Sequence, residues 1–81
     1  EGMLSSDMKT LFVTTGKYLV AYNSGEEVDR LRVPKGFYGY SWALDGDQIE
    51  FSLTHKRYIY TVEISYEDGD LDVVSVTGTR I

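Results

Sequence analysis

Two neighbouring segments in which every second side chain is apolar or aromatic place the strongest constraint on the fold. The alternation runs over residues 48–54 and again over 58–64. One face then carries Ile49, Phe51 and Leu53 and, from the second segment, Tyr58, Tyr60, Val62 and Ile64. Successive side chains of a β-strand point to opposite faces, so these segments are predicted to be the two strands of a hairpin. The preceding Asp45-Gly46-Asp47 is typical of a turn, because Gly adopts positive φ and Asp bonds its own backbone.

The rest of the chain also reads as β-structure. Apolar residues never recur at the three-four spacing of a helix, and β-branched and aromatic residues dominate. Further strands are expected at 3–4, 10–14, 18–23, 28–33, 36–44 and 71–77. Asn23-Ser24-Gly25 predicts a hairpin turn. Pro34 is expected to end the strand at 28–33, because proline has no N–H to donate to a neighbouring strand. Residues 65–70 are expected to form a loop around Gly69, and 78–81 a frayed tail.

The predicted strands fall into two repeats of about 40 residues, roughly 5–35 and 43–78, within a single domain spanning 1–81. Residues 7–14 align with 45–52, so that Leu11 corresponds to Ile49 and Val13 to Phe51. Residues 18–22 align with 58–62, and a turn and a fourth strand follow in each copy. Four strands in such a repeat is the content of a propeller blade. The repeat predicts an all-β fold of two four-stranded antiparallel sheets.

A family resemblance rests on the starts of these repeats. Residues 5–14, Ser-Ser-Asp-Met-Lys followed by an apolar strand, resemble the serine-proline-aspartate-glycine-lysine signature of WD-like repeats in TolB-type β-propellers. Residues 43–52 are similar, and residues 58–64 look like the third strand of such a blade. Both turns lack the proline, Met8 replaces a glycine, and no Gly-His or Trp-Asp pair is present. The resemblance implies an interaction scaffold or a non-catalytic gating piece of a larger hydrolase, and it assigns no functional residue.

Two blades do not close a ring, because about three or more stacked repeats are needed for stability. Three arrangements remain: a fragment of a longer propeller, several copies assembled into a ring, or a small β-sandwich of two packed sheets. The faces differ between the repeats. The second sheet has a polar face that carries Glu50, Ser52, Thr54, Thr61 and Glu63. Such a polar face suits a sheet that is covered on its other face only. The first sheet is apolar on both sides, and we expect it to meet a partner.

Composition excludes several classes of function. The net charge of −5 disfavours nucleic acid and anionic membranes, since both are polyanionic surfaces. No apolar run reaches the length of a transmembrane helix. Without cysteine the chain has no disulfide or thiolate metal site, and nothing indicates its compartment. Seven Tyr, three Phe and one Trp are the expected source of buried area in so short a chain.

Charged residues mark two candidate sites, each weighed against a plain structural role. His55-Lys56-Arg57 forms a basic hairpin tip that suits a phosphate or an acidic peptide, although a solvated turn explains it more simply. His55 is the only histidine, which excludes a multi-histidine metal site. Asp68, Asp70 and Asp72 alternate around a turn and suit a hard cation, but the spacing does not fit an EF-hand, and structural turns are favoured.

Aromatic residues mark the third candidate. Tyr38, Tyr40, Trp42 and Leu44 are expected to lie in phase along one strand. The aromatic members form a candidate stripe that would stack on sugars or peptide prolines, with core filling as the simpler explanation. The stripe also includes Phe37, Tyr58, Tyr60 and Tyr66. Gly39-Tyr40-Ser41-Trp42-Ala43 superficially matches a nucleophile elbow, but no helix follows it.

The sequence therefore predicts a non-enzymatic interaction module that binds a protein partner or self-associates, with no cofactor. The repeat, the lack of a catalytic set and the open apolar faces motivate this hypothesis. The alternatives are a small carbohydrate-binding domain that uses the aromatic stripe and a non-catalytic piece of a larger hydrolase.

Overall fold

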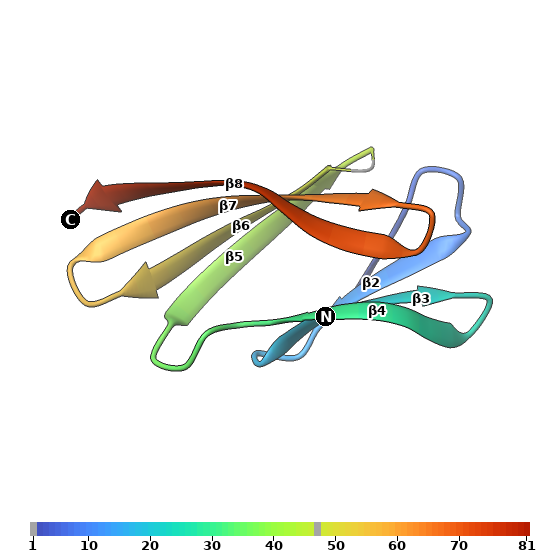
Figure 1. Cartoon of the computed structure of the whole chain (residues 1–81), viewed down its shortest axis with the longest axis horizontal. Coiled ribbons are helices and arrows are strands. Elements are labelled where there is room, and N and C mark those ends of the chain that lie inside the picture. Colours follow the sequence, from blue (N-terminus) through green and yellow to red (C-terminus); the bar gives the residue numbers. More distant parts are fainter. Residues whose placement is uncertain (1, 47) are drawn as a thin grey trace.

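The described residues form eight strands and no helix. The computed structural model describes residues 2–46 and 48–81, with the backbone alone at 39 and 40. The strands are β1 (Gly2–Leu4), β2 (Thr10–Thr14), β3 (Tyr18–Asn23), β4 (Glu26–Arg32), β5 (Tyr38–Asp45), β6 (Gln48–His55), β7 (Tyr58–Glu67) and β8 (Asp70–Arg80). They form two antiparallel sheets in chain order, β1-β2-β3-β4 and β5-β6-β7-β8 (Figure 1). This confirms the predicted all-β class with two four-stranded sheets, and no helix among these residues is long and apolar enough to cross a membrane.

Tight turns connect the strands within each sheet. Ser24 (φ 54°) and Gly25 (φ 82°) join β3 to β4, and Asp68 (φ 49°) and Gly69 (φ 85°) join β7 to β8. Two successive residues with positive φ match the twist of a hairpin, and short polar residues and glycine tolerate that conformation. The predicted turn at residues 23–25 is therefore confirmed.

The two sheets pack face to face around one core. Phe12, Leu19 and Ala21 of the first sheet are buried against residues of the second. The second sheet contributes Ile49, Phe51, Leu53, Ile64 and Leu71. The Phe12 ring meets the Tyr66 ring edge to face, with centroids 5.2 Å apart. The backbone N–H of Leu71 donates to the Asp29 carboxylate at 2.7 Å and so ties β8 to β4. The arrangement is a small sandwich of two open sheets.

The sheets stack head to tail. Ile49 and Phe51 of β6 face the core, whereas the aligned residues of β2, Leu11 and Val13, point to the opposite side, and Phe12 is the buried residue between them. Equivalent faces of the two repeats therefore point in the same direction, as in a stack of successive repeats. The first sheet keeps an apolar outer face, with Leu4 52% exposed, and the second sheet ends the stack with exposed Glu50 and Glu63. The expected polar and apolar character of these faces is confirmed, and the expected partner of the first sheet stays a prediction.

The second sheet is longer than the first. Strands β1–β4 have 3 to 7 residues, whereas β5–β8 have 8 to 11. Figure 1 shows that the end of the second sheet that carries the β6–β7 turn and the C-terminus extends past the first sheet. The inner face of this second sheet is thus covered along only part of its length.

Several predicted boundaries were wrong in the second repeat and at the start of β4. β4 begins at Glu26 rather than 28, and β7 continues to Glu67 through the expected loop. The expected frayed tail is instead the end of β8, and the N–H of Ile81 donates to the carbonyl of Arg57 at 2.8 Å. Cross-strand pairing along the whole of β7 orders these residues, which polarity and turn propensity alone do not predict.

The predicted phase of β5 was also wrong. Trp42 and Leu44 lie opposite Phe51 and Ile49 on the inner face, but the register shifts between 38 and 41. Tyr38 therefore pairs with Thr54 and lies on the outer face, 59% exposed. A single extra residue in a strand reverses the facing of every side chain beyond it.

Candidate functional site

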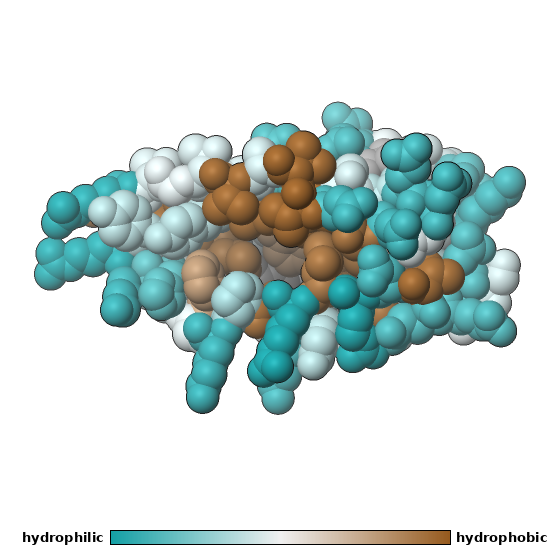
Figure 2. Space-filling model, viewed as in Figure 1, coloured by the Kyte–Doolittle hydropathy of each residue, from teal (hydrophilic) through white to brown (hydrophobic). Residues whose placement is uncertain are grey.

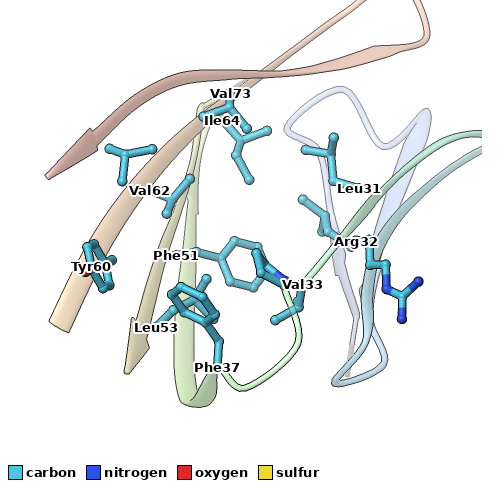
Figure 3. A pocket seen from close by; sticks show the side chains of 13 residues that line it. Leu31, Arg32, Val33, Phe37, Phe51, Leu53, Tyr60, Val62, Ile64 and Val73 are labelled. Carbon is cyan, nitrogen blue, oxygen red and sulfur yellow. The ribbon is translucent and has the colours of Figure 1, made fainter. Parts of the chain in front are cut away.

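An apolar groove lies where the second sheet extends past the first. Its volume is about 400 Å³. The second sheet supplies its floor, and Leu31 and Val33 of the first sheet face that floor from the opposite side (Figure 3). The floor and wall from the second sheet consist of Phe51, Leu53, Tyr60, Val62, Ile64, Val73 and Val76. Figure 2 shows these hydrophobic side chains as a central hollow bordered below by long hydrophilic ones.

The exposure of the groove residues increases along β8. Leu71 is buried beneath the first sheet, whereas Val73 is 52% exposed and Val76 is 58% exposed. Their cross-strand partners Ile64 and Val62 belong to the same face, so the apolar surface is continuous across the two strands. Exposed, contiguous apolar surface on a protein this small is typical of an interaction site.

An aromatic cluster closes the far end of the groove. Phe37 stacks on His55, with ring centroids 4.6 Å apart, and packs at a tilt against Tyr60 at 5.7 Å. Tyr58 lies 6.0 Å from Tyr60 on the same strand. The Tyr60 ring lies over Gly78, where a Cβ atom would come within 2.9 Å of ring carbon Cε1. Glycine at 78 thus lets an aromatic ring spread across β8.

Basic residues gather around this end of the molecule. Arg80 pairs with Tyr58 in the ladder, and the Arg57 carbonyl accepts a hydrogen bond from Ile81. Lys35 lies in the β4–β5 connection next to Gly36, which approaches the His55 ring. Six of the eight basic residues lie here, namely Lys17, Arg32, Lys35, Lys56, Arg57 and Arg80. Segments 30–44, 51–62 and 73–81, which form the groove end, contain no Asp or Glu. The rim of the groove is therefore cationic although the chain is acidic overall.

Acidic residues gather at the opposite end. Glu26 and Glu27 begin β4. Glu67 ends β7, and Asp68 lies in the β7–β8 turn, which packs beside Val28 of β4. The Arg30 guanidinium binds Glu27, which lowers the pKa of that carboxyl and raises the pKa of Arg30. The charges of the molecule are thus separated along its long axis, which measures 39 Å.

The three residues of the predicted basic tip differ in their exposure to solvent. His55 is half-buried under Phe37, whereas Lys56 and Arg57 are exposed in the turn, where Lys56 adopts a positive φ of 56°. His55 contacts the groove residue Phe37, and the phosphate or acidic-peptide site stays a prediction. Among the described residues, no group of three or more His, Asp or Glu side chains is arranged to hold a metal ion, and this includes Asp68, Asp70 and Asp72.

The predicted aromatic stripe does not form one surface among the residues described. Phe37 lies at the groove, and Tyr38 lies on the outer face of the second sheet. Trp42 is half-buried and stacks on Phe51 with centroids 5.9 Å apart, and its Nε1 is buried without a hydrogen-bond partner. Tyr66 packs against Phe12 in the core. The side chain of Tyr40 and all of Asp47 lie outside the described residues.

A second depression lies on the outer face of the first sheet, the face expected to meet a partner. Its volume is about 760 Å³, and Leu4, Met8, Leu11 and Tyr22 line it together with polar residues of the β3–β4 turn. Beside it, Arg30 covers the Tyr18 ring at 4.6 Å from the centroid. This depression is less apolar than the groove because Lys9, Asn23 and Ser24 also border it.

The groove residues of β8, and Val33 and Pro34 of the β4–β5 connection, were not predicted as a site. One signal in the sequence could have found them: Val73 and Val74 are adjacent, which departs from the alternation of a strand with one polar face. No protein-family model matches this chain, and neither does any curated protein or solved structure. The TolB-type resemblance therefore stays a prediction, and the site has to be interpreted from its own residues.

Proposed function

We propose that this protein is a non-catalytic interaction module whose groove binds a segment of a protein partner. The observation that carries the proposal is the apolar groove where the second sheet extends past the first, with Val73 and Val76 exposed along β8. Uncovered apolar surface favours association because its burial is worth about 25 cal/mol per Å². A groove with mainly aliphatic walls provides the shape and chemistry for side chains of a polypeptide.

The proposal favours a protein partner over a sugar. Carbohydrates stack on exposed aromatic faces and need converging polar groups, whereas this groove is walled mainly by Leu, Ile and Val. Its aromatic residues pack on one another at one end, through Phe37, His55 and Tyr60. A second copy of the chain would also be a protein partner. The molecular mass of the free protein in solution distinguishes a second copy from a different protein.

The test is selection of binders from a phage-displayed library of random peptides, followed by affinity measurements on two variants. Val76→Gln places a polar group in the groove, and Thr77→Gln makes a similar change on the opposite face of the same strand. Selected peptides are expected to bind Val76→Gln up to about tenfold more weakly, since burying a valine is worth about 1.5 kcal/mol. Thr77→Gln is expected to bind as the unchanged protein does.

The two variants also show how the proposal fails. Equal affinities for Val76→Gln and Thr77→Gln would place binding elsewhere, and so would a selection that yields no peptide with groove-dependent affinity. Circular dichroism and chemical denaturation of both variants verify that each one is folded to the same extent.

A further inference from the structure

The groove borders a free edge of the second sheet, and its hydrogen-bonding groups can be assigned. β8 is the last strand of its sheet. The N–H of Ile81 points inward, because it donates to the Arg57 carbonyl. Residues of an antiparallel strand point their N–H and C=O alternately toward and away from the neighbour. Counting back along the ladder, Arg80, Gly78 and Val76 direct both groups outward, away from β7.

The other end of β8 independently gives the same assignment of inward and outward backbone groups. The N–H of Leu71 points outward, because it donates to Asp29 of β4 at 2.7 Å. The register shift opposite Glu63 and Ile64 inserts one extra residue into β8. With that residue included, the count from Leu71 also directs the backbone groups of Val76 outward. The Asp29 carboxylate therefore occupies the edge at Leu71, and the bulge disturbs it near Val73 and Val74. The open part of the edge is residues 76–80.

The open edge and the groove floor belong to the same residues. Val76, Gly78 and Arg80 pair with Val62, Tyr60 and Tyr58, which lie on the groove side of the sheet. A strand added along residues 76–80 would take up the outward backbone groups and place alternate side chains over the groove. At Gly78 such a side chain would meet the face of the Tyr60 ring, which spreads over the glycine.

The charge of the surroundings selects the kind of strand. Arg80, Arg57 and Lys35 lie around this end, and the segments that form it contain no Asp or Glu side chain. Opposite potentials across an interface favour association and disfavour partners of like charge. A strand with apolar residues at every second position and acidic residues at its ends is complementary to both the floor and the rim.

We propose that the partner segment is an acidic, extended polypeptide that adds to β8 as a fifth strand along residues 76–80. This inference rests on the proposed function and specifies its ligand. The binding would combine backbone hydrogen bonds at the edge, apolar contacts with Val76 and Tyr60, and charge attraction to Arg80 and its neighbours.

The experiment uses synthetic peptides with one alternating valine-threonine core and either two glutamates or two lysines at each end. Isothermal titration calorimetry at low salt is expected to show about tenfold tighter binding of the glutamate peptide. The difference should shrink at high salt, since screening weakens exposed ion pairs. Arg80→Glu should remove much of the preference, whereas Lys9→Glu, at the acidic end near Asp68, should leave it unchanged.

Backbone pairing is tested by N-methylation of alternate amides of the glutamate peptide, in each of the two phases. One phase removes the amides that face β8 and is expected to abolish binding. The other phase removes amides that face solvent and is expected to have little effect. Equal binding of both methylated peptides would overturn strand addition.

Failure of this inference is distinguishable from failure of the proposed function. Equal affinity of the glutamate and lysine peptides, each reduced by Val76→Gln but not by Thr77→Gln, would overturn the acidic partner and leave the groove as a binding site. No binding of the glutamate peptide at millimolar concentration would overturn the inference as well. Light scattering on the free protein is expected to give a monomer, and a dimer disrupted by Val76→Gln would make a second copy the occupant.

Discussion

The two sheets of this protein have the same strand order but different strand lengths, and the difference creates the site. In the first sheet, β1–β4 are short, and their inner face is covered by the second sheet at Phe12, Leu19 and Ala21. In the second sheet, the same kind of face continues past the end of its partner, so that Val73 and Val76 remain exposed. A mismatch in length between stacked sheets, together with the β4–β5 connection at Val33, Pro34 and Phe37, forms the apolar groove.

The comparison also separates stability from binding. Residues in the covered part hold the sheets together, and residues in the uncovered part are available to a partner. Substitutions in the two parts should therefore have different consequences, and the predictions below test that division from the largest expected effect to the smallest.

Phe12→Ala tests the covered part and should be the most disruptive change. Phe12 is completely buried and packs on Tyr66, so its truncation leaves a cavity between the sheets. We expect a loss of about 3–5 kcal/mol in the free energy of unfolding, measured by chemical denaturation. Leu11→Ala, on the neighbouring residue that faces outward, should cost about 1 kcal/mol or less. Similar losses for the two variants would show that the sheets do not pack through this face.

Gly78→Val tests the uncovered part. A Cβ atom at this position would lie 2.9 Å from Cε1 of Tyr60, so the ring has to move. We expect a loss of about 1 kcal/mol, at the low end for overpacking because the ring is able to rotate and valine favours strands. Nuclear Overhauser contacts should show Tyr60 displaced from Phe37. Thr79→Val, on the opposite face, is the control, and unchanged contacts in Gly78→Val would contradict the described position of the ring.

Asp7→Asn tests the acidic end of the first sheet and should have the smallest effect. The Asp7 carboxylate accepts hydrogen bonds from the Ser5 hydroxyl at 2.6 Å and the Lys9 N–H at 2.9 Å, which lower its pKa below 3.8. A lowered pKa in the folded state means that the charged carboxylate stabilises the fold above pH 3.8, and that this contribution is lost as the pH falls through the folded-state pKa.

The Asp7 prediction is measured by thermal denaturation as a function of pH. Asp7→Asn should melt slightly below the unchanged protein at neutral pH, and the two melting temperatures should converge in acid. Asp72→Asn, in the second sheet, serves as the control. A difference that persists at pH 2 would assign the effect to a cause other than the charge.

Local patterns predicted the strands well and their ends less well. The alternation around Ile49, Phe51 and Leu53 fixed both the strand and its buried face, because a two-residue period has one structural meaning. Tyr38 was placed on the wrong face because a register shift leaves no mark in the pattern. The end of β8 was missed because residues 78–80 are ordered by their partners on β7 rather than by their own propensity.

The candidate site was less predictable than the fold. Phe37 was recognised from its aromatic ring and lines the groove, and His55, recognised as part of the basic tip, stacks on it. Val62 and Val76 of the groove floor are apolar residues of the kind found in any core strand. The sequence does not predict which of these residues the other sheet leaves uncovered.

By itself the sequence determined the class of this protein, its two repeats of four strands and the apolar character of their faces. These properties follow from periodicity and turn chemistry, which act between residues close in the chain. The tertiary structure alone decided that the sheets stack head to tail, that the longer one projects past the shorter, and that the basic residues gather around the uncovered face. These features depend on contacts between residues far apart in the chain, such as Asp29 with Leu71 and Phe12 with Tyr66, which a local pattern does not encode.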